Sequence, residues 1–570
     1  MRRFVLIAIT LLLACGVWAG TVTGRVFVDL NGDGTYQAGE AGVAGVLVSD
    51  GATLVRTAAD GVYRLEMPDG EQVVFVENPA GTWATKGFYR NVKVGPAEAD
   101  FPLVRQEQKV PFYFVQGTDL HIRPGVEPQM AQYVAAINGL AVPLAFVVHT
   151  GDLVADTNGS DVNEARKQFG LYKQMVAGLK PPLLNLPGNH EHVAANRKDI
   201  PPTTPGWGKG LYREVFGPTY YAFNYAGVHL VALDGSRFVN NKLAWDMSPE
   251  CLEWLKAYLA QVPASEPLVL LIHEPFATLP GKAQIEEALK GRKVLLSLSG
   301  HGHGIARWTF AGAPEIMGGA TSYAWHGSNF GANALGYHLV KITGDGVDSA
   351  FGDWAEKYPV TVLTPGRMAM PKGTIKVEAL FLDLKNEVQS AEVGIGSALV
   401  KVPEIGTQGM YRKVTTELTV PPLPDGVHDL VITLHGQGEP FVERQPFVVL
   451  TGQQEPFTAA GPARLRTTVK SVQAPHAIRV NGREVVKLDP AAGEVQKVDV
   501  EIPAEALRRL NVVEMVSGPL AEGAGYDDCN AEFITLLYQG KVYRDCRING
   551  VNLKKAAEAQ TGTMYFDLTR

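Results

Sequence analysis

The chain has 570 residues, which is too long for one hydrophobic core, because single cores stop growing at about 250–300 residues. Hydrophobic residues make up 46% and charged residues 19%, which excludes a disordered chain and a chain that runs through a membrane along its length. The net charge of −7 is spread over the whole chain, so no nucleic-acid-binding surface is expected.

The first residues, 1–19, predict an export signal. Two arginines precede an apolar run from Phe4 to Ala14, and the small residue Ala19 ends the segment. A membrane anchor is the alternative, but the run is shorter than the roughly 20 residues that cross a bilayer. We therefore expect an exported protein, either periplasmic, secreted or lipid-anchored to the cell envelope. Membrane attachment would follow only from lipidation of Cys15, because residues 12–15 resemble a bacterial lipobox.

Residues 20–105 predict a small antiparallel β-sandwich, because short alternating runs are separated by Gly, Asp and Pro. One of its turns fits the calcium-loop pattern D-x-[DN]-x-[DN]-G-x5-E. With strands beside it in place of helices, it resembles the calcium loops of bacterial B-type sandwich repeats. A polar turn without a cation is an equally open alternative. The expected Ca2+ ligands are Asp29, Asn31, Asp33, Thr35, Gln37 and Glu40.

Residues 106–355 predict an α/β domain, since apolar strands alternate with helical stretches such as 163–178 and 249–261. Beyond this domain the helical patterns nearly vanish. We expect an immunoglobulin- or fibronectin-like β-sandwich over 356–450 and a C-terminal β-sandwich over 451–570. Cys529 and Cys546 are the plausible disulfide pair, although a hairpin turning at Gln539 and Gly540 would not place them opposite each other.

The histidines concentrate in the α/β domain, where ten of 13 lie between His121 and His338. Side chains that bind metals follow an apolar run five times, and loops at the carboxyl ends of strands converge on one crevice in α/β sheets. Carboxylate, imidazole and amide groups suit divalent Mn, Fe, Zn or Ni. Glycine beside four of the five sets lets the backbone turn sharply. In chain order the sets are Asp119 with His121, then Asp152, then Asn189 with His190, then His273, and last His301 with His303.

These motifs, DxH, GD, GNHE, a single His after a strand and GHxH, resemble the calcineurin-like metallophosphoesterase superfamily in content and order. The resemblance covers roughly residues 106–353. It implies two packed mixed β-sheets flanked by helices, with the sandwiches before and after them as in multidomain bacterial members. It also implies a binuclear centre that hydrolyses phosphomonoesters or phosphodiesters through a hydroxide bridging the two metals.

The resemblance assigns a role to each motif residue. Asp119, His121 and His303 would hold one metal, Asn189, His273 and His301 the other, and Asp152 would bridge them and take part in catalysis. His190 would bind the phosphate or protonate the leaving oxygen. Substrate contacts are expected from neighbouring loop residues, namely Glu191, His192, Arg307 and His326.

A second function class remains open on the sequence alone. The β-domains could bind a glycan or wall polymer of the cell envelope, with the metal domain a vestige. Intact ligand types at every motif position argue against a vestige. The substrate itself is not predicted, because specificity lies in loop shape and not in the metal motifs.

Overall fold

The computed structural model describes residues 20–570 apart from 68–70, 94–96, 240–241, 323–334, 345, 355–357, 359, 367, 369, 453–455, 494, 520–527, 549 and 555–559. The expected export signal and Cys15 therefore lie outside the described residues. The chain divides into two compact units, Met1–Lys357 and Tyr358–Arg570. Within the described part, no helix is both long and apolar enough to cross a membrane.

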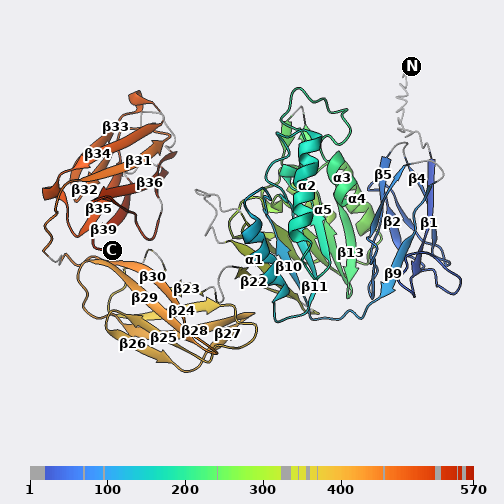
Figure 1. The fold of residues 1–570 in the computed structure, drawn as a ribbon, viewed down its shortest axis with the longest axis horizontal. Coiled ribbons are helices and arrows are strands. Elements are labelled where there is room, and N and C mark those ends of the chain that lie inside the picture. The colour runs from blue at the N-terminus through green and yellow to red at the C-terminus, as the bar shows by residue number, and fades with distance from the viewer. Residues whose placement is uncertain are drawn as a thin grey trace, which may run out of the picture. The chain divides into compact units, whose positions relative to one another are not determined.

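The first unit begins with two sheets that share one core (Figure 1). Alternating side chains such as Val22, Leu65 and Val74 point between the sheets, as in a β-sandwich. One sheet has the order β4 (Val62–Met67), β1 (Gly20–Val28), β9 (Phe101–Arg105), β6 (Thr82–Trp83), with β8 (Ala97–Glu98) on β1. The other has the order β3 (Leu54–Arg56), β2 (Leu47–Ser49), β5 (Glu71–Val76), β7 (Tyr89–Lys93).

Two mixed sheets form the central domain, and their facing side chains build the largest core of the unit. The first sheet has the order β12 (Leu183–Leu186), β11 (Leu144–Thr150), β10 (Phe112–Gly117), β21 (Gly336–Ile342), β22 (Val347–Asp353). The second has the order β13 (Tyr221–Tyr225), β14 (Val228–Ala232), β17 (Pro267–Leu271), β18 (Lys293–Ser299), β20 (Ala313–Met317), β19 (Ala306–Phe310). β10, β11 and β12 run parallel, as do β14, β17 and β18, so both sets of carboxyl ends lie at one edge.

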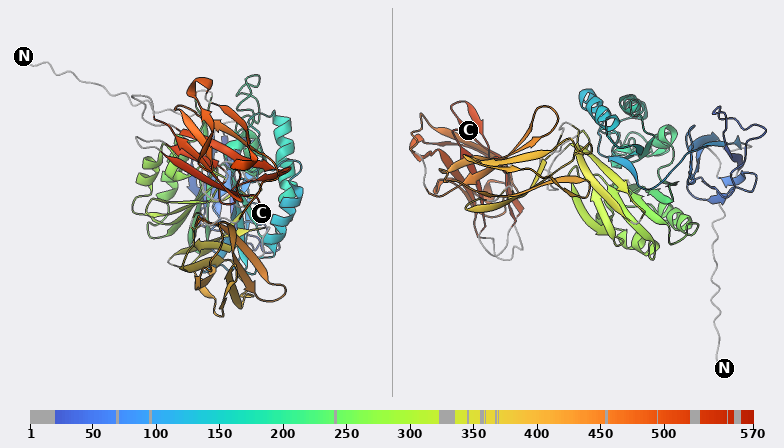
Figure 2. Two further views of the ribbon diagram at one scale, coloured as in Figure 1. Left: turned by 90° about the vertical axis from the view of Figure 1, so that its left-hand side faces the viewer. Right: turned by 90° about the horizontal axis from the view of Figure 1, so that it is seen from below.

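Helices cover the outer faces of the two central sheets, with α1 and α2 on one side and α4 and α5 on the other (Figures 1 and 2). Asp161 begins α2 by accepting hydrogen bonds from the backbone N–H of Asn163 and Glu164, as expected for a helix-start residue. The helices are α1 (Glu127–Asn138), α2 (Val162–Val176), α3 (Gly210–Phe216), α4 (Pro249–Leu259) and α5 (Lys282–Ala288), with short 3-10 turns η1 (Asn189–Glu191) and η2 (Phe276–Thr278). A separate hairpin, β15 (Arg237–Val239) and β16 (Lys242–Ala244), follows β14.

The second unit contains two pairs of antiparallel sheets, each pair around its own core. The first pair is β23 (Val360–Thr364), β24 (Thr374–Phe381), β28 (Tyr411–Thr419), β27 (Gly406–Gln408) and β26 (Ala398–Val402), β25 (Ser390–Ile395), β29 (Gly426–His435), β30 (Phe441–Val449). The second pair is β34 (Gln496–Ile502), β31 (Ala463–Lys470), β36 (Asp528–Tyr538), β37 (Lys541–Tyr543), with β38 (Gly550–Lys554) on β36, and β33 (Arg483–Leu488), β32 (His476–Val480), β35 (Leu510–Ser517), β39 (Thr561–Asp567). The 3-10 turns η3 (Pro490–Ala492) and η4 (Ala504–Ala506) connect strands of the second pair.

The disulfide expected between Cys529 and Cys546 is wrong, because both residues are thiols. Cys529 of β36 faces Leu553 of β38. The β36–β37 hairpin pairs Leu536 with Tyr543, so its register extended would bring Cys546 near Phe533. Four residues of strand span roughly 13 Å, and disulfides need Cα atoms within about 7 Å.

The N-terminal sandwich is joined to the central domain by polar and aromatic contacts. The indole of Trp254 in α4 packs on Phe75 and donates a hydrogen bond to Ser49 Oγ at 3.2 Å. Beside it, Glu77 accepts a hydrogen bond from the Tyr258 hydroxyl at 2.6 Å and lies 3.1 Å from Nδ1 of the buried His229. The other ring nitrogen of His229 lies 2.5 Å from Glu266. A buried imidazole thus sits between two carboxylates where the two domains meet.

This arrangement predicts a pH-dependent stability of the first unit. Burial lowers the pKa of His229, but Glu77 and Glu266 outweigh it and raise the pKa above its ordinary value. The protonated form is therefore the stabilising one: its contribution is complete below the ordinary histidine pKa of about 6.5 and is lost as pH rises through the raised value. We expect His229→Asn to lower the melting temperature of this unit more at pH 6 than at pH 9. His428→Asn, at a half-buried histidine of the second unit, serves as the control. If His229→Asn lowered the melting temperature equally at both pH values, the prediction would be wrong.

Candidate metal centre

The residues of the five sequence motifs meet at the edge formed by the carboxyl ends of the central strands. The first sheet supplies Asp119 and His121 after β10, Asp152 after β11 and Asn189 after β12. The second sheet supplies His273 after β17 and both His301 and His303 after β18. Parallel strands from two packed sheets therefore bring donors that are far apart in sequence to one place.

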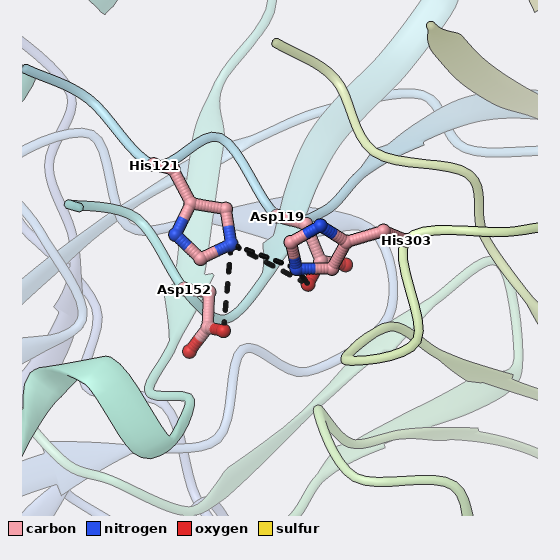
Figure 3. A group of neighbouring side chains, drawn as sticks. All are labelled: Asp119, His121, Asp152 and His303. Atoms are coloured by element: carbon pink, nitrogen blue, oxygen red, sulfur yellow. Dashed lines mark hydrogen bonds and ion pairs between the residues drawn. The ribbon is translucent and has the colours of Figure 1, made fainter. Parts of the chain in front are cut away.

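A first group consists of Asp119, His121, Asp152 and His303, whose donor atoms all lie within 4.8 Å of one another (Figure 3). Nε2 of His121 and Nε2 of His303 are 3.1 Å apart. Asp119 Oδ1 is 3.3 Å from His303 Nε2, and Asp152 Oδ2 is 3.7 Å from His121 Nε2. All four residues are buried, so two carboxylates and two imidazoles converge with little access for water.

A second group shares Asp152 with the first and adds His273 and His301. Asp152 Oδ2 lies 3.1 Å from His273 Nε2. Asn189 joins this group, since its Oδ1 lies 2.8 Å from Nδ1 of His301. The two groups thus meet at one carboxylate, an arrangement that suits two neighbouring cations.

The local hydrogen bonds fit these donors to a cation. Nδ1 of His273 lies 2.8 Å from the carbonyl oxygen of Thr150, to which it can donate, and this leaves the lone pair on Nε2. That Nε2 atom is buried and makes no hydrogen bond within the described structure. A histidine oriented through its far nitrogen in this way is typical of metal ligands. Asp119 is oriented too, because both of its oxygens accept from the His301 backbone N–H at 3.0–3.1 Å.

The charges of the centre depend on one another. Burial opposes ionisation of Asp152, but the surrounding imidazoles, His273 first, hold its pKa well below the ordinary value. Burial likewise opposes a charged His273, yet Asp152 raises the pKa of that imidazole well above its usual range. A cation among these donors would compete with the imidazole proton, so we expect binding of metal to release protons.

Five of these residues have a left-handed backbone conformation, which L-residues avoid at a cost of about 1–3 kcal/mol each. The φ angles are 50° at Asp119, 44° at His121, 50° at Asp152, 72° at His301 and 57° at His303. Such strain persists only where surrounding contacts hold it, and it concentrates at functional sites. This conformation turns each side chain inward directly after its strand or loop.

The neighbouring glycines mainly provide space. A Cβ on Gly188 would lie 2.3 Å from Asp152 Oδ1, and one on Gly300 would lie 1.9 Å from Thr118 Oγ1. At Gly151 a Cβ would meet the His273 ring at 2.6 Å, and here φ is also positive at 86°. Sharp turning, the role expected from the sequence, therefore applies to Gly151, whereas Gly188 and Gly300 are needed for close packing.

Glu191, which the sequence analysis expected to contact substrate, is buried against the loops of the centre. It is completely buried, and its oxygens accept backbone N–H groups of Asp152 at 3.0 Å, Leu153 at 2.8 Å and Gly188 at 2.7 Å. Burial, followed by the charge of Asp152, raises the pKa of Glu191 to about 7. The carboxyl group thus ties the loop after β11 to the loop after β12.

Two of the other three residues expected to contact substrate, His192 and Arg307, are described by the structure. His192 is buried, with Nε2 3.3 Å from Ser236 Oγ. Arg307 is exposed on β19, and its charge adds to burial in lowering the pKa of His338 to about 4. His326 lies outside the described residues.

The N-terminal loop expected to bind calcium has its carboxylates turned to the backbone. Asp29 accepts from the N–H groups of Gly32 and Gly34, and Glu40 accepts from those of Leu30 and Gln37, at 2.7–3.0 Å. Asp33 accepts from the N–H of Thr35 at 2.7 Å, and Asn31 accepts from that of Asp33 at 3.0 Å. Across the described residues, only the two groups at the centre bring three acidic, histidine or cysteine side chains into metal-binding distance. These hydrogen bonds hold the loop as a polar turn, and calcium binding by it stays a prediction.

Two residues near the centre were missed by the sequence analysis. Trp245, which follows β16, is 57% exposed and contacts the ring of His301. Glu274, directly after His273, is buried, and neither of its oxygens makes a hydrogen bond within the described structure. Trp245 could have been noticed in the sequence, because it is a tryptophan in a segment without a repeating apolar pattern. The second has no sequence signal, because burial of a carboxylate depends on the tertiary fold.

Comparisons with known proteins give two family matches. The family model "Calcineurin-like phosphoesterase" matches residues 112–304, and the model "N terminal of Calcineurin-like phosphoesterase" matches residues 30–106. No curated protein matches the chain.

Three solved structures with weak similarity to this chain are the following. GAP50, the anchor in the inner membrane complex of Plasmodium, is 14% identical with a TM-score of 0.32, covering 44% of this chain and 86% of its own. The phosphopantetheinyl hydrolase of Mycobacterium tuberculosis is 16% identical with a TM-score of 0.24, covering 37% and 90%. Vps29 of Entamoeba histolytica, solved with zinc, is 12% identical with a TM-score of 0.21, covering 43% and 99%.

The scores of these structures are low, so the assignment comes from the two family models. Their matched residues contain every strand of the N-terminal sandwich except β1, and the strands that carry the buried centre. The chain therefore contains a calcineurin-like phosphoesterase domain, with the N-terminal domain of that family before it and additional β-sheets after it.

Proposed function

We propose that the chain is a hydrolase of phosphomonoesters or phosphodiesters that works with two divalent cations. The observation that carries the proposal is the shared carboxylate of Asp152, which belongs to both buried donor groups. Asp119, His121 and His303 would hold one cation and Asn189, His273 and His301 the other. Imidazole, amide and carboxylate donors suit Mn, Fe, Zn or Ni.

Two cations at this site would supply an activated water and an electrostatic clamp for the phosphate. The chain itself fixes the donors and excludes competing water, since most of them are buried. We propose His190 as the residue that handles a proton. Its Nε2 lies 3.8 Å from Asp152 Oδ2, and its side chain is 29% exposed, so it can reach a bound ester.

His190 is also held in place by its own backbone. The N–H donates to Asp152 Oδ1 at 3.0 Å, and the carbonyl accepts from the Thr157 hydroxyl at 2.6 Å. The imidazole therefore stands beside the shared carboxylate without belonging to either donor group. This suits a group that binds the phosphate or gives a proton to the leaving oxygen.

The alternative function, an envelope glycan-binding protein with a vestigial metal domain, has less support. A decaying site would no longer need five strained backbone conformations, yet the residues of both groups keep them. We further propose export, to the periplasm, the medium or a lipid anchor at Cys15, from the apolar segment in residues 1–19.

Substitution of the shared carboxylate gives the first test. We expect Asp152→Asn to lose bound transition metal and to lower turnover of chromogenic phosphoesters by at least about a hundredfold, because both donor groups lose their common charge. Elemental analysis and initial rates measure the two effects. The matched control is Asp161→Asn, because asparagine also begins helices well and Asp161 belongs to neither donor group. Equal rates in wild type and Asp152→Asn would end the hydrolase proposal.

Substitution of His190 separates proton handling from metal binding. We expect His190→Ala to lower kcat by about 100- to 10,000-fold, the usual contribution of a positioned acid or base. Its metal content should stay that of the wild type, because His190 lies in neither donor group. Loss of metal in this variant would show that His190 is a ligand.

A calcium ion in the N-terminal loop stays a prediction. If it binds there, added Ca2+ should raise the melting temperature of the wild type, and Glu40→Gln should remove that rise, because the last loop position supplies two oxygens. Glu98→Gln, an exposed change in the same sandwich, is the control. If added Ca2+ did not change the melting temperature of the wild type, the calcium prediction would be wrong and the loop would be a polar turn.

A further inference from the structure

Trp245 is a large aromatic side chain at the rim of the metal centre. More than half of it is exposed, at 57%, and its ring centroid lies 4.8 Å from that of His301 with an interplanar angle of 67°. His301 belongs to the second donor group. The indole therefore stands between this group and the solvent.

The hairpin that carries Trp245 is anchored at its start. Ser236, directly before β15, accepts hydrogen bonds from Nζ of the buried Lys209, through its carbonyl at 2.9 Å and its hydroxyl at 3.0 Å. The same lysine pairs with Asp234. Ser236 Oγ also contacts His192, so this histidine from the GNHE segment helps to position the hairpin.

The end of the hairpin is anchored as well. Asp246, directly after Trp245, accepts from both Nε and an Nη of Arg237, at 3.1 and 2.5 Å. Phe238 packs edge-to-face on Trp207 with ring centroids 4.9 Å apart. Trp245 is thus presented by a fixed support at both ends, and its exposure is not that of a free loop.

An indole in this position has no core to stabilise, and most of its surface faces water. The neighbouring donors are charged or polar and suit cations that would bind a phosphate, whereas the indole offers an apolar π surface. Aromatic side chains use such a surface to stack on planar rings. When a phosphoester binds at the donor groups, its alcohol substituent extends away from the phosphate. A substituent that extends past His301 toward Trp245 would contact the indole.

We propose that Trp245 selects phosphoesters whose leaving group carries a planar ring, as in a nucleoside, by stacking on that ring. The inference rests on the proposed function and names the substrate class for the same centre. Phosphoesters of small acyclic alcohols would bind through the phosphate alone and gain nothing from the indole.

The test compares matched esters in the metal-loaded full-length protein. Adenosine 5′-monophosphate and glycerol phosphate form the monoester pair, and a dinucleoside phosphate and glycerophosphoethanolamine form the diester pair. We expect Trp245→Ala to lower kcat/KM about tenfold for the ring-bearing ester of the class that is cleaved, as for one lost stacking contact. The value for the ring-free ester should be unchanged, and Trp245→Phe should retain most of the preference.

Phe533→Ala, at an aromatic residue 48% exposed in the second unit, controls for loss of any surface aromatic. Equal changes for both esters, or none, would overturn the inference while leaving the hydrolase proposal intact. Equilibrium binding of adenosine 5′-monophosphate and of inorganic phosphate gives a readout without turnover. If the wild type cleaves no ester, the hydrolase proposal fails, and the binding experiment still tests the role of Trp245. The inference is supported if the wild type binds the nucleotide more tightly than phosphate and Trp245→Ala removes that difference. Equal binding of the two ligands by the wild type would refute it.

Discussion

The shared position of Asp152 is the constraint on which the rest of the centre depends. One carboxylate must lie within reach of donors from both sheets, with Oδ2 3.1 Å from His273 and 3.7 Å from His121. Its other oxygen accepts the backbone N–H of His190, and its own N–H donates to Glu191. A shift of this residue would therefore disturb both donor groups at once, which explains why its surroundings are so closely fixed.

The fold meets this constraint by packing two mixed sheets with their parallel strands ending at one edge. Each sheet contributes only part of either donor group, so the centre exists only when the two sheets are packed together. The common core of the domain, which includes Phe114, Leu230 and Leu270, holds that packing. The N-terminal sandwich adds to it, because Phe75 and Leu47 belong to the same buried cluster. A domain outside the centre thus contributes to the rigidity that the centre needs.

Much of this arrangement could be predicted from the sequence, since donors that follow apolar strands must meet at the carboxyl edge of an α/β sheet. The α/β architecture with β-sandwiches on either side follows from the same patterns of apolar residues. What the motifs could not give was the direction of each side chain. Glu191 and His192 stand in the same segment as Asn189, yet they point to backbone amides and to Ser236. Direction depends on φ, and although His and Asp adopt a left-handed backbone more often than most residues, residue type alone does not predict it at His121 or Asp152.

Longer-range features escaped the sequence for a related reason. Cys529 lies on β36, which pairs with β38, so that Cys529 is opposite Leu553 and not opposite Cys546. The spacing of cysteines in the sequence does not predict this strand order. The calcium pattern in the first sandwich describes oxygen-rich residues at given intervals, and the same residues satisfy a turn by accepting backbone N–H groups. In both cases one local pattern is compatible with two structures. Pairing with a distant strand selects between them for Cys529, whereas calcium binding by the loop stays a prediction.

The GNHE segment shows how closely function and support are combined in this domain. Over four consecutive residues, 189–192, one side chain joins a donor group, one stands beside the shared carboxylate, one ties two loops together and one braces the hairpin of Trp245. Because neighbouring residues in a short 3-10 turn point in different directions, such a segment can reach the centre, the backbone beneath it and the rim above it together. A mutation at a buried supporting position, such as Glu191, should then affect the centre through the loops that it joins, because its carboxylate binds backbone N–H groups of both.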